Sequence, residues 1–409
     1  MGNLPQSLRR FIRSCRLCVM SSDAQVIVVG LGAVGSAALL SLASRGVRCI
    51  GVDRFDPPHT RGSSHGLSRL IRLCYYEHPD YVPLLIESYR LWRDLETRSC
   101  TRLLDITGGV YIGRPHDPFV AGSLQTAIER GLEHELLSPA KLRQQIPVIN
   151  VSESEVAFFE PTTGVLFPER CITSSLRIAE ASGAQIRRHT KVLEWSDTSS
   201  RVRVLTESGV LCADVMILCA GAWTSHLMPE LSPRLSITRQ VLAWFEPKNP
   251  ELLMSGHLPA WAVSREDGAA FYGFPIVASD GPDRLGGVGF KVALHATGPA
   301  ADPEQHRTEV ETCEIEQLRE FLLNRFPAAF GGSPKLLNAC ACMYTNTPDH
   351  HFLIDRHPRS NNVIVVSACS GHGFKLSPAI GRAAADLAFD GHTSLPIEFL
   401  SWRPSMRST

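Results

Sequence analysis

The chain has 409 residues, of which 44% are hydrophobic and 20% are charged, as is typical of a soluble globular protein. This length predicts two domains, or one domain with a large insertion. Lys plus Arg and Asp plus Glu each number 41, so the charge balance gives no support for a nucleic-acid partner. Because no apolar run approaches the roughly 18 residues of a membrane span, we expect no membrane partner either.

The first 22 residues form a separate, basic extension. They contain Arg9, Arg10, Arg13 and Arg16 and no acidic residue, which is a pattern of mitochondrial transit peptides. We favour a disordered tail, or a true start at Met20, and keep a transit peptide as the alternative. The chain ends in Arg-Ser-Thr, which is not the peroxisomal signal Ser-Lys-Leu. We expect an intracellular protein, cytoplasmic first, with peroxisomal or mitochondrial placement as alternatives.

The twelve cysteines are scattered along the chain, and several of them lie inside apolar runs. This distribution predicts mostly buried free thiols in a reducing compartment.

A dinucleotide-binding pattern follows the extension. Residues 26–29 form a short apolar run that predicts a buried parallel strand. The glycine-rich sequence GLGAVG comes next, and residues 36–44 predict a helix. Residues 47–52 predict a second strand, which ends on an aspartate. This order of strand, glycine turn, helix, strand and acid predicts a bound dinucleotide of the NAD or FAD type.

Each residue of this pattern has a physical task. Gly30 permits the tight turn, Gly32 permits close approach of a pyrophosphate, and Gly35 permits close packing of helix and strand. The phosphates face free N–H groups at the start of the helix. Asp53 is placed to accept a hydrogen bond from a ribose hydroxyl.

Two arginines lie shortly after this unit. Arg69 and Arg72 are three residues apart in an apolar frame, so on a helix or turn they share one face. We expect that face to line a cleft; a solvated surface or a structural ion pair is the alternative.

The remaining elements suggest two interleaved sheets. Helices are expected at 81–95, 138–146 and 377–389, and buried strands of the first sheet within 213–225, running into Gly221, and at 363–369. The alternating segments QVLAWFEP and AAFYGFPI predict strands of a second sheet.

Several stretches together resemble the monomeric sarcosine oxidase family, which includes N-methyltryptophan oxidase and the pipecolate oxidases. They are VIVVGLGAVGSAA, VDRFDPPHTRGSSHGLSRLIR, EPTTGVLFPERC, GFKVALH, CMYTNTPDHHFLIDRHP and SGHGFKLSPAIG, in the family's order. The resemblance implies an α/β fold in which a Rossmann-like FAD-binding domain is interleaved with an α+β substrate domain on a mixed or antiparallel sheet. We assign residues 23–106, 165–240 and 345–409 to the FAD domain, and residues 107–164 and 241–344 to the substrate domain.

The resemblance also implies an activity. The substrate would be a secondary or N-methyl amino acid, such as sarcosine or L-pipecolate, oxidised to an imine while O2 becomes H2O2. The partners would then be this small molecule and O2, and we expect a monomer. A fructosyl amino acid oxidase, a dehydrogenase and a non-catalytic flavin-binding protein are the alternatives.

The same resemblance assigns roles to residues. Arg72 and Lys375 correspond to the residues that hold the substrate carboxylate, and Tyr272 and Tyr344 to the walls of the pocket. Lys291 corresponds to a lysine that speeds the reaction with oxygen, and His295 to a histidine beside the substrate. Lys291 and His295 are four residues apart, so on a strand they share a face and are expected to point toward one cavity. The catalytic set is Lys291, His295, Arg69 and Tyr344. The cofactor-binding set is Gly30, Gly32, Gly35, Asp53, Ser64, His65, Arg69, Cys342, Gly371, Gly373 and Lys375.

The segment CACMYTNTPDHHFLIDRHP raises separate questions. Its Cys-x-Cys spacing and the lack of a second cysteine pair disfavour zinc, so we expect no metal. Residues two apart on a strand are also poorly placed for a disulfide. By resemblance, Cys342 is the residue that carries FAD through an 8α-S-cysteinyl bond. Cys340 is then a buried neighbour.

Two departures concern the pocket. The stretch 276–287 is longer than the resemblance leads us to expect, and Ala262 and Val263 stand where larger side chains are expected. Both suggest a roomier pocket, suited to a cyclic or bulky amino acid.

Overall fold

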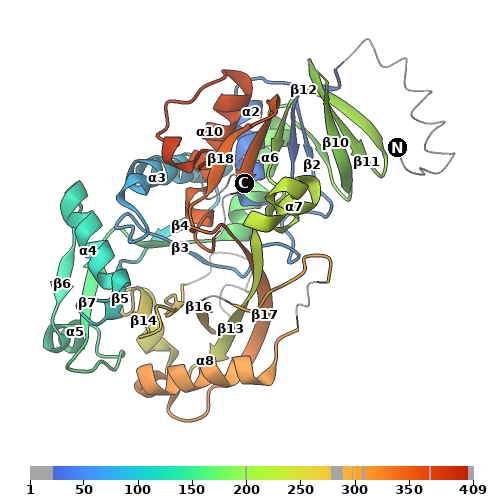
Figure 1. Ribbon diagram of the computed structural model, residues 1–409. Coiled ribbons are helices and arrows are strands. Elements are labelled where there is room, and N and C mark those ends of the chain that lie inside the picture. The colour runs from blue at the N-terminus through green and yellow to red at the C-terminus, as the bar shows by residue number, and fades with distance from the viewer. Residues whose placement is uncertain are drawn as a thin grey trace.

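The computed structural model describes residues 22–198, 200–277, 289–296, 298–305, 309–367 and 370–403. The expected extension at 1–22, except its last residue, and most of the stretch 276–287 lie outside these ranges. Figure 1 shows one large sheet with helices in the upper part of the molecule and a second sheet with α8 below it.

The upper sheet carries the dinucleotide-binding pattern. Its strands run in the order β10-β11-β12-β1-β2-β9, with β19 on β12 and β18 on β19. β1 pairs in parallel with β2 and with β12, and β19 pairs in parallel with β12. The parallel core that the apolar runs predict is therefore confirmed. The strands are β1 (Ala24–Val29), β2 (Cys49–Val52), β9 (Gln185–Arg187), β10 (Val192–Thr198), β11 (Arg201–Thr206), β12 (Gly209–Leu218), β18 (Leu353–His357) and β19 (Ser360–Ser367).

Helices cover this sheet. They are α2 (Ala33–Ser44), α3 (Val82–Ser99), α6 (Pro168–Ala181) and α10 (Ser377–Phe389). α2 and α10 are packed so closely that a Cβ added to Gly381 would lie 2.7 Å from the Cβ of Ala37. Small residues at this crossing hold the glycine turn before α2 against the C-terminal part of the chain.

The lower sheet is mixed, as predicted for the second sheet. Its order is β17-β13-β16-β15-β14-β5-β7-β6, and β14 with β5 is its parallel pair among the described strands. Trp261 stacks on Phe321 and Phe290, which fixes α8 (Thr312–Arg325) on this sheet. The strands are β5 (Gly109–Gly113), β6 (Glu135–Leu137), β7 (Val156–Glu160), β13 (Ser236–Glu246), β14 (Ala260–Ser264), β15 (Ala270–Gly273), β16 (Phe290–His295) and β17 (Lys335–Asn346).

Smaller elements join the two sheets. β3 (Arg69–Ile71), β8 (Gly164–Leu166) and β4 (Leu104–Ile106) form a three-stranded sheet. α4 (Pro118–Arg130), α5 (Pro139–Gln145), α7 (Thr224–Leu227) and α9 (Pro327–Phe330) complete the α-helices of the described residues. α5 begins after Ser138, whose Oγ accepts from the N–H of Lys141 as its N-cap.

The expectation that Arg69 and Arg72 share one face of a helix or turn is wrong. Arg69 lies on strand β3 and Arg72 just beyond its end, where alternate side chains point to opposite faces. A run of three to five residues does not distinguish a strand from a helix by its pattern. The two guanidinium groups therefore reach different partners.

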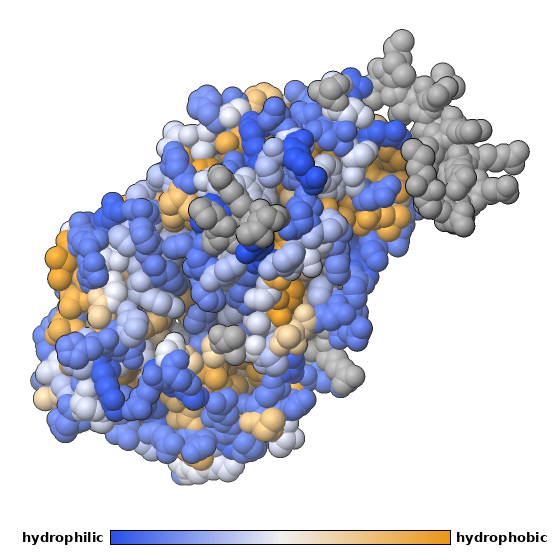
Figure 2. Space-filling view, viewed as in Figure 1, coloured by the Kyte–Doolittle hydropathy of each residue, from blue (hydrophilic) through white to orange (hydrophobic). Residues whose placement is uncertain are grey.

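The surface is mostly hydrophilic on the face drawn in Figure 2. Hydrophobic residues gather at the left edge of that view, over α4 and β6, where Ile128 and Leu136 are exposed. Within the described ranges, no helix is long and apolar enough to cross a membrane.

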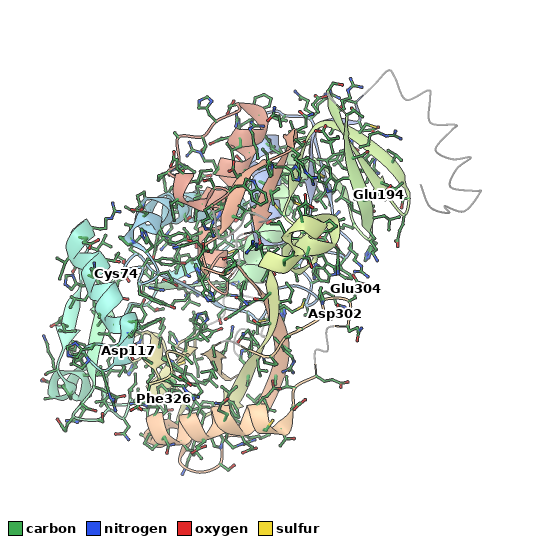
Figure 3. The ribbon with its side chains drawn as sticks, viewed as in Figure 1. Cys74, Asp117, Glu194, Asp302, Glu304 and Phe326 are labelled. Atoms are coloured by element: carbon green, nitrogen blue, oxygen red, sulfur yellow. The ribbon has the colours of Figure 1, made fainter. Side chains whose placement is uncertain are left out.

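The fully buried Glu160, at the end of β7, holds the chain that follows β3. Its Oε1 accepts from the N–H of Leu73 at 2.6 Å and from the Thr162 hydroxyl at 2.7 Å. Its Oε2 accepts from the N–H of Cys74 at 3.1 Å, a residue labelled in Figure 3. This carboxylate fixes the segment that carries Arg72.

We expect Glu160→Ala to lower the free energy of unfolding by about 3 kcal/mol, because two buried N–H groups and a hydroxyl lose their acceptor. Chemical denaturation measures the change. Glu153→Ala is the control: its ion pair with Arg143 is exposed and contributes less than about 1 kcal/mol. Equal losses for the two variants would contradict the assignment.

Candidate active site

One cavity of about 670 Å³ extends from the glycine turn to the lower sheet. Residues of both sheets and of the segments between them line it. They include Gly30, Gly32, Asp53, Ser64, Arg69, Arg72, Tyr272, His295, Cys342, Tyr344, Gly371, Gly373 and Lys375. The structure thus brings most of the predicted site residues to one space. Gly35, His65 and Lys291 are not among the lining residues and lie behind them.

The glycine turn is shaped for close approach. Gly30 has φ +87°, and a Cβ there would lie 2.4 Å from the carbonyl oxygen of Cys219. A Cβ on Gly35 would lie 1.7 Å from the carbonyl oxygen of Gly30. In contrast, a Cβ on Gly32 would meet only the Ser64 hydroxyl, at 3.6 Å. Gly30 and Gly35 therefore permit close packing of backbone segments, whereas Gly32 leaves space on the cavity side, at the N-cap of α2.

Asp53 ends β2 beside this turn. Its Oδ2 accepts from the N–H of Leu31 at 2.7 Å and its Oδ1 from the N–H of Phe55 at 2.8 Å. A carboxylate has about four acceptor positions, so Asp53 retains capacity for a hydroxyl of a ligand.

The outer end of the cavity is bordered by Glu304, labelled in Figure 3. Its carboxylate accepts from Arg54 and, at 2.9 Å, from the Trp223 indole N–H. The hydrogen bond from Arg54 lowers the pKa of Glu304 to about 2. Glu304 is therefore ionised at neutral pH and holds Arg54 and Trp223 together at this end.

The loop before β3 links the two ends of the cavity. Ser63 donates to the carbonyl of Met343 at 2.5 Å, which ties the loop to β17. Ser64 accepts from the N–H of Ala33 at 3.3 Å, at the start of α2. Arg69 donates to the carbonyls of Ser63 and Ser68, each at 2.8 Å.

Arg72 is buried and forms an ion pair. Its guanidinium donates to the carbonyl of Cys74 at 2.8 Å and to Glu77 at 2.6 Å. It also lies 4.6 Å from the centre of the Tyr75 ring and 5.4 Å from that of Phe119. Arg72 therefore forms an ion pair, as the alternative expectation for it had it, and this pair lies in the cavity wall.

The charges of this pair support each other. Burial opposes the charge of Glu77, but Arg72 holds the pKa of Glu77 below its usual range. Burial also opposes the charge of Arg72, but Glu77 raises the pKa of Arg72 above its usual value. Both groups are therefore ionised at neutral pH.

Lys375 lies in the 3-10 turn before α10. It donates to the carbonyl of His372 at 2.9 Å and lies 5.0 Å from the centre of the Tyr75 ring. Burial, and then Arg72, lower the pKa of Lys375 to about 7. This lysine is therefore balanced between its two protonation states at neutral pH.

His372 is held as one neutral tautomer. Its Nε2 lies 3.0 Å from the carbonyl oxygen of His350 and its Nδ1 lies 2.5 Å from the Tyr75 hydroxyl. A carbonyl only accepts, so Nε2 carries the proton and Nδ1 accepts from Tyr75. Burial lowers the pKa of His372 to about 3.

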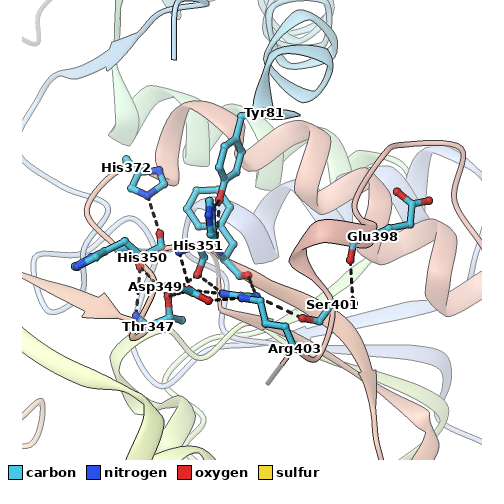
Figure 4. A network of polar contacts seen from close by, with 11 residues as sticks. Tyr81, Thr347, Asp349, His350, His351, His372, Glu398, Ser401 and Arg403 are labelled. Atoms are coloured by element: carbon cyan, nitrogen blue, oxygen red, sulfur yellow. Dashed lines mark hydrogen bonds and ion pairs between the residues drawn. The ribbon is translucent and has the colours of Figure 1, made fainter. Parts of the chain in front are cut away.

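Figure 4 shows how the C-terminal segment supports this corner. Arg403 donates to both carboxylate oxygens of Asp349, at 2.5 and 2.6 Å. It also donates to the carbonyls of His351 and Phe352. The turn that contains His350 is thereby fixed.

The opposite wall contains His295 and two tyrosines. Nδ1 of His295 lies 3.2 Å from the hydroxyl of Tyr344, and Tyr344 is also hydrogen-bonded to Tyr272. Burial lowers the pKa of His295 to about 4, so this imidazole is neutral at neutral pH. A Cβ on Gly371 would lie 2.5 Å from the Tyr344 ring, which explains the glycine there.

Cys342 lies on β17 and lines the cavity, while Tyr344, two residues on, shares its face. The thiols of Cys340 and Cys342 are both free, and burial raises the pKa of each. Within the described ranges, no group of three metal-ligating side chains is formed.

Lys291 lies behind the cavity wall. Its ammonium donates to the carbonyls of Gly66 and Ser68, at 2.6 and 3.0 Å, and to the Ser68 hydroxyl at 3.1 Å. The expectation that Lys291 and His295 both point into one cavity is met only by His295. Burial, and then Arg69, lower the pKa of Lys291 to about 7.

Several cavity residues have no counterpart in the sequence analysis. Glu77 and His372 were not singled out, although an acid five residues after a buried arginine is a usable signal. Tyr75, Tyr76 and Phe119 were also missed. Their role depends on contacts between distant segments.

Comparison with known proteins places this geometry in a family. The sequence model of the FAD dependent oxidoreductases matches residues 25–387. Monomeric sarcosine oxidase of Streptomyces avermitilis is 38% identical, over 92% of this chain and 97% of that protein. Monomeric sarcosine oxidase of Bacillus sp. is 37% identical, over 95% of this chain and 98% of that protein. N-methyl-L-tryptophan oxidase of Salmonella enteritidis is 31% identical, over 90% and 95%.

Solved structures show the same fold at lower identity. NikD, an unusual amino acid oxidase essential for nikkomycin biosynthesis, is 22% identical with a TM-score of 0.80, over 93% of this chain and 98% of that one. Glycine oxidase from Geobacillus kaustophilus is 17% identical with a TM-score of 0.77, over 94% of this chain and 99% of that one. The expected fold class, a Rossmann-like FAD-binding part with a substrate part, is thus confirmed. On this evidence the chain belongs to the family of FAD-dependent oxidoreductases.

Proposed function

We propose that this protein is an FAD-dependent oxidase of secondary or N-methyl amino acids. The observation that carries the proposal is a single cavity in which the glycine turn and Asp53 at one end are continuous with Arg72, Lys375 and His295 at the other. Relatives named monomeric sarcosine oxidase and N-methyl-L-tryptophan oxidase support it. The substrate would lose two electrons and two protons to form an imine, and O2 would gain them to form H2O2.

The cavity fits FAD at both ends. The open side of Gly32, at the N-cap of α2, suits a pyrophosphate, and Asp53 suits a ribose hydroxyl. Ser64, Arg69, Gly371 and Gly373 would border the rest of the cofactor. FAD, when bound, would accept the electron pair of the substrate and pass it to oxygen.

The substrate carboxylate would bind between Arg72 and Lys375. A guanidinium fork is the strongest donor for such a group. Because Glu77 occupies one side of Arg72 in this structure, the incoming carboxylate would compete with Glu77 or share the cation with it. Two cations around one internal acid leave a net positive charge for the ligand.

The substrate amine would face His295 and Tyr344. Neutral His295 is able to accept a hydrogen bond or a proton from the amine, which must be uncharged when it is oxidised. Tyr272 and Tyr344 would close the wall around it and exclude water.

The space beside these residues favours a substrate larger than sarcosine. Ala262 on β14 and Ala270 on β15 both line the cavity, next to Tyr272. Small side chains on neighbouring strands leave room for a ring or an aromatic group.

We expect peroxide release in air from secondary amino acids, with a higher kcat/KM for L-pipecolate than for sarcosine. An amine panel that includes N-methyl and fructosyl amino acids, with peroxide detection and anaerobic bleaching of the flavin, tests this. Ala262→Leu would lower kcat/KM for L-pipecolate more than that for sarcosine, because it fills the added space. Preference for sarcosine would refute the roomier pocket, and no reaction with any amine would refute the oxidase.

We propose that Cys342 carries FAD through a thioether, since its buried thiol faces the cavity beside Met343 and Tyr344. After acid precipitation, yellow flavin should stay in the pellet of the wild-type protein and appear in the supernatant of Cys342→Ser. Cys340→Ser is the matched control and should keep the flavin in the pellet. Free flavin from the wild type would exclude the tether.

Carboxylate binding should weaken as pH rises through the pKa of Lys375, about 7 in the free protein. The protonated amine binds the anion, so affinity is full below pH 7 and lost above it. We expect Kd for propanoate to rise about tenfold between pH 6 and pH 8, measured by perturbation of the flavin spectrum. Lys375→Met should bind weakly at both pH values, with a flat profile; a pH-dependent profile in that variant would assign the effect to another group.

A further inference from the structure

The structure assigns to Glu169 the role of a positioning residue for Lys291: it holds the turn whose carbonyls orient the ammonium and supplies negative charge that favours the protonated form of this lysine. The inference rests on the proposed function, because it concerns the lysine that would act on oxygen. Glu169 lies in the first turn of α6 and is not predicted as a site residue by the sequence.

The turn is held by one carboxylate oxygen. Oε1 of Glu169 accepts from the N–H of Gly66 at 2.7 Å and from the N–H of Leu67 at 3.1 Å. Both residues have positive φ, +96° and +68°, and for Leu67 this conformation is costly. Two hydrogen bonds to an ionised acceptor offset that cost.

The carbonyl side of the same turn holds Lys291. The carbonyl of Gly66 accepts from its ammonium at 2.6 Å and that of Ser68 at 3.0 Å. The carbonyl of Ser68 also accepts from Arg69 at 2.8 Å. Glu169 therefore binds the N–H and Lys291 the carbonyl of one residue, Gly66, and the two cations Lys291 and Arg69 both donate to the carbonyl of Ser68.

The charge balance around Lys291 gives Glu169 a second task. Arg69 repels the ammonium, while Glu169, Cys340 and Cys342 attract it when ionised. Burial raises the pKa of both thiols, so they are neutral at neutral pH. The other neighbours are the rings of Trp244 and Phe274, at 5.5 and 5.2 Å. Glu169 is thus the anion that offsets Arg69.

The test separates charge from geometry. Glu169→Gln retains an amide oxygen that accepts from both N–H groups, but it has no charge. Glu169→Ala removes both. The matched control is Glu180→Gln, in the same helix, whose carboxylate pairs with Arg188 at the surface.

Two measurements on the holoprotein need no substrate. The pH titration of the Lys291 ammonium ¹⁵N resonance, assigned with Lys291→Met, reports its protonation. Amide exchange of Gly66 and Leu67 reports the turn. We expect the Lys291 midpoint to fall by about one unit in Glu169→Gln, and exchange to accelerate about tenfold in Glu169→Ala but not in Glu169→Gln. A further readout is the rate at which O2 reoxidises flavin that has been reduced with light. As pH rises, this rate should fall at a correspondingly lower pH in Glu169→Gln than in the wild type.

A Lys291 midpoint in Glu169→Gln that coincides with the wild type overturns the proposal, even where Glu169→Ala loosens the turn, because the role is then structural only. Unchanged exchange in Glu169→Ala overturns it as well. If Glu169→Ala does not fold, the titration of Glu169→Gln decides alone. If no amine yields peroxide, the proposed function fails while both measurements still decide on Glu169.

Discussion

The buried ion pair between Arg72 and Glu77 is the constraint on which the cavity depends. Removing both charges from water is costly, and the pair is retained only with full hydrogen bonding. The guanidinium of Arg72 donates to the carbonyl of Cys74 and packs against the rings of Tyr75 and Tyr76. Glu160 holds the same segment by accepting from the N–H of Cys74. An arginine in this position always needs a carboxylate. The proposed substrate carboxylate would therefore replace part of an interaction that the fold already maintains.

Two buried lysines with similar pKa values have different uses because their hydrogen bonds differ. An ammonium has three donors. Those of Lys291 all reach Gly66 and Ser68, so it is saturated and lies behind the wall. Lys375 donates to one carbonyl among the described residues and lines the cavity, so it has donors available for a ligand. The number of donors already in use, rather than the pKa alone, separates a binding cation from a positioned one.

Local patterns predicted the strands and helices around the glycine turn, because period and glycine placement are properties of neighbouring residues. They failed at Arg69 and Arg72, where a short apolar run suits a helix, turn or strand equally. They also missed Glu77 and Glu169. The contact of Glu169 with Gly66 spans about a hundred residues of chain, and no local pattern encodes such a partner. The resemblance named the residues that we propose to touch substrate and flavin, but not those that hold them.

The support of Lys375 illustrates how far such positioning extends. Arg403 fixes the turn around His350 through Asp349, and the carbonyl of His350 accepts from His372. The carbonyl of His372 in turn accepts from Lys375. Because Nε2 of His372 must carry its proton for this arrangement, Tyr75 donates to Nδ1, and the ring remains neutral. A chain of hydrogen bonds thus connects the C-terminal segment to Lys375, whose orientation depends on its members.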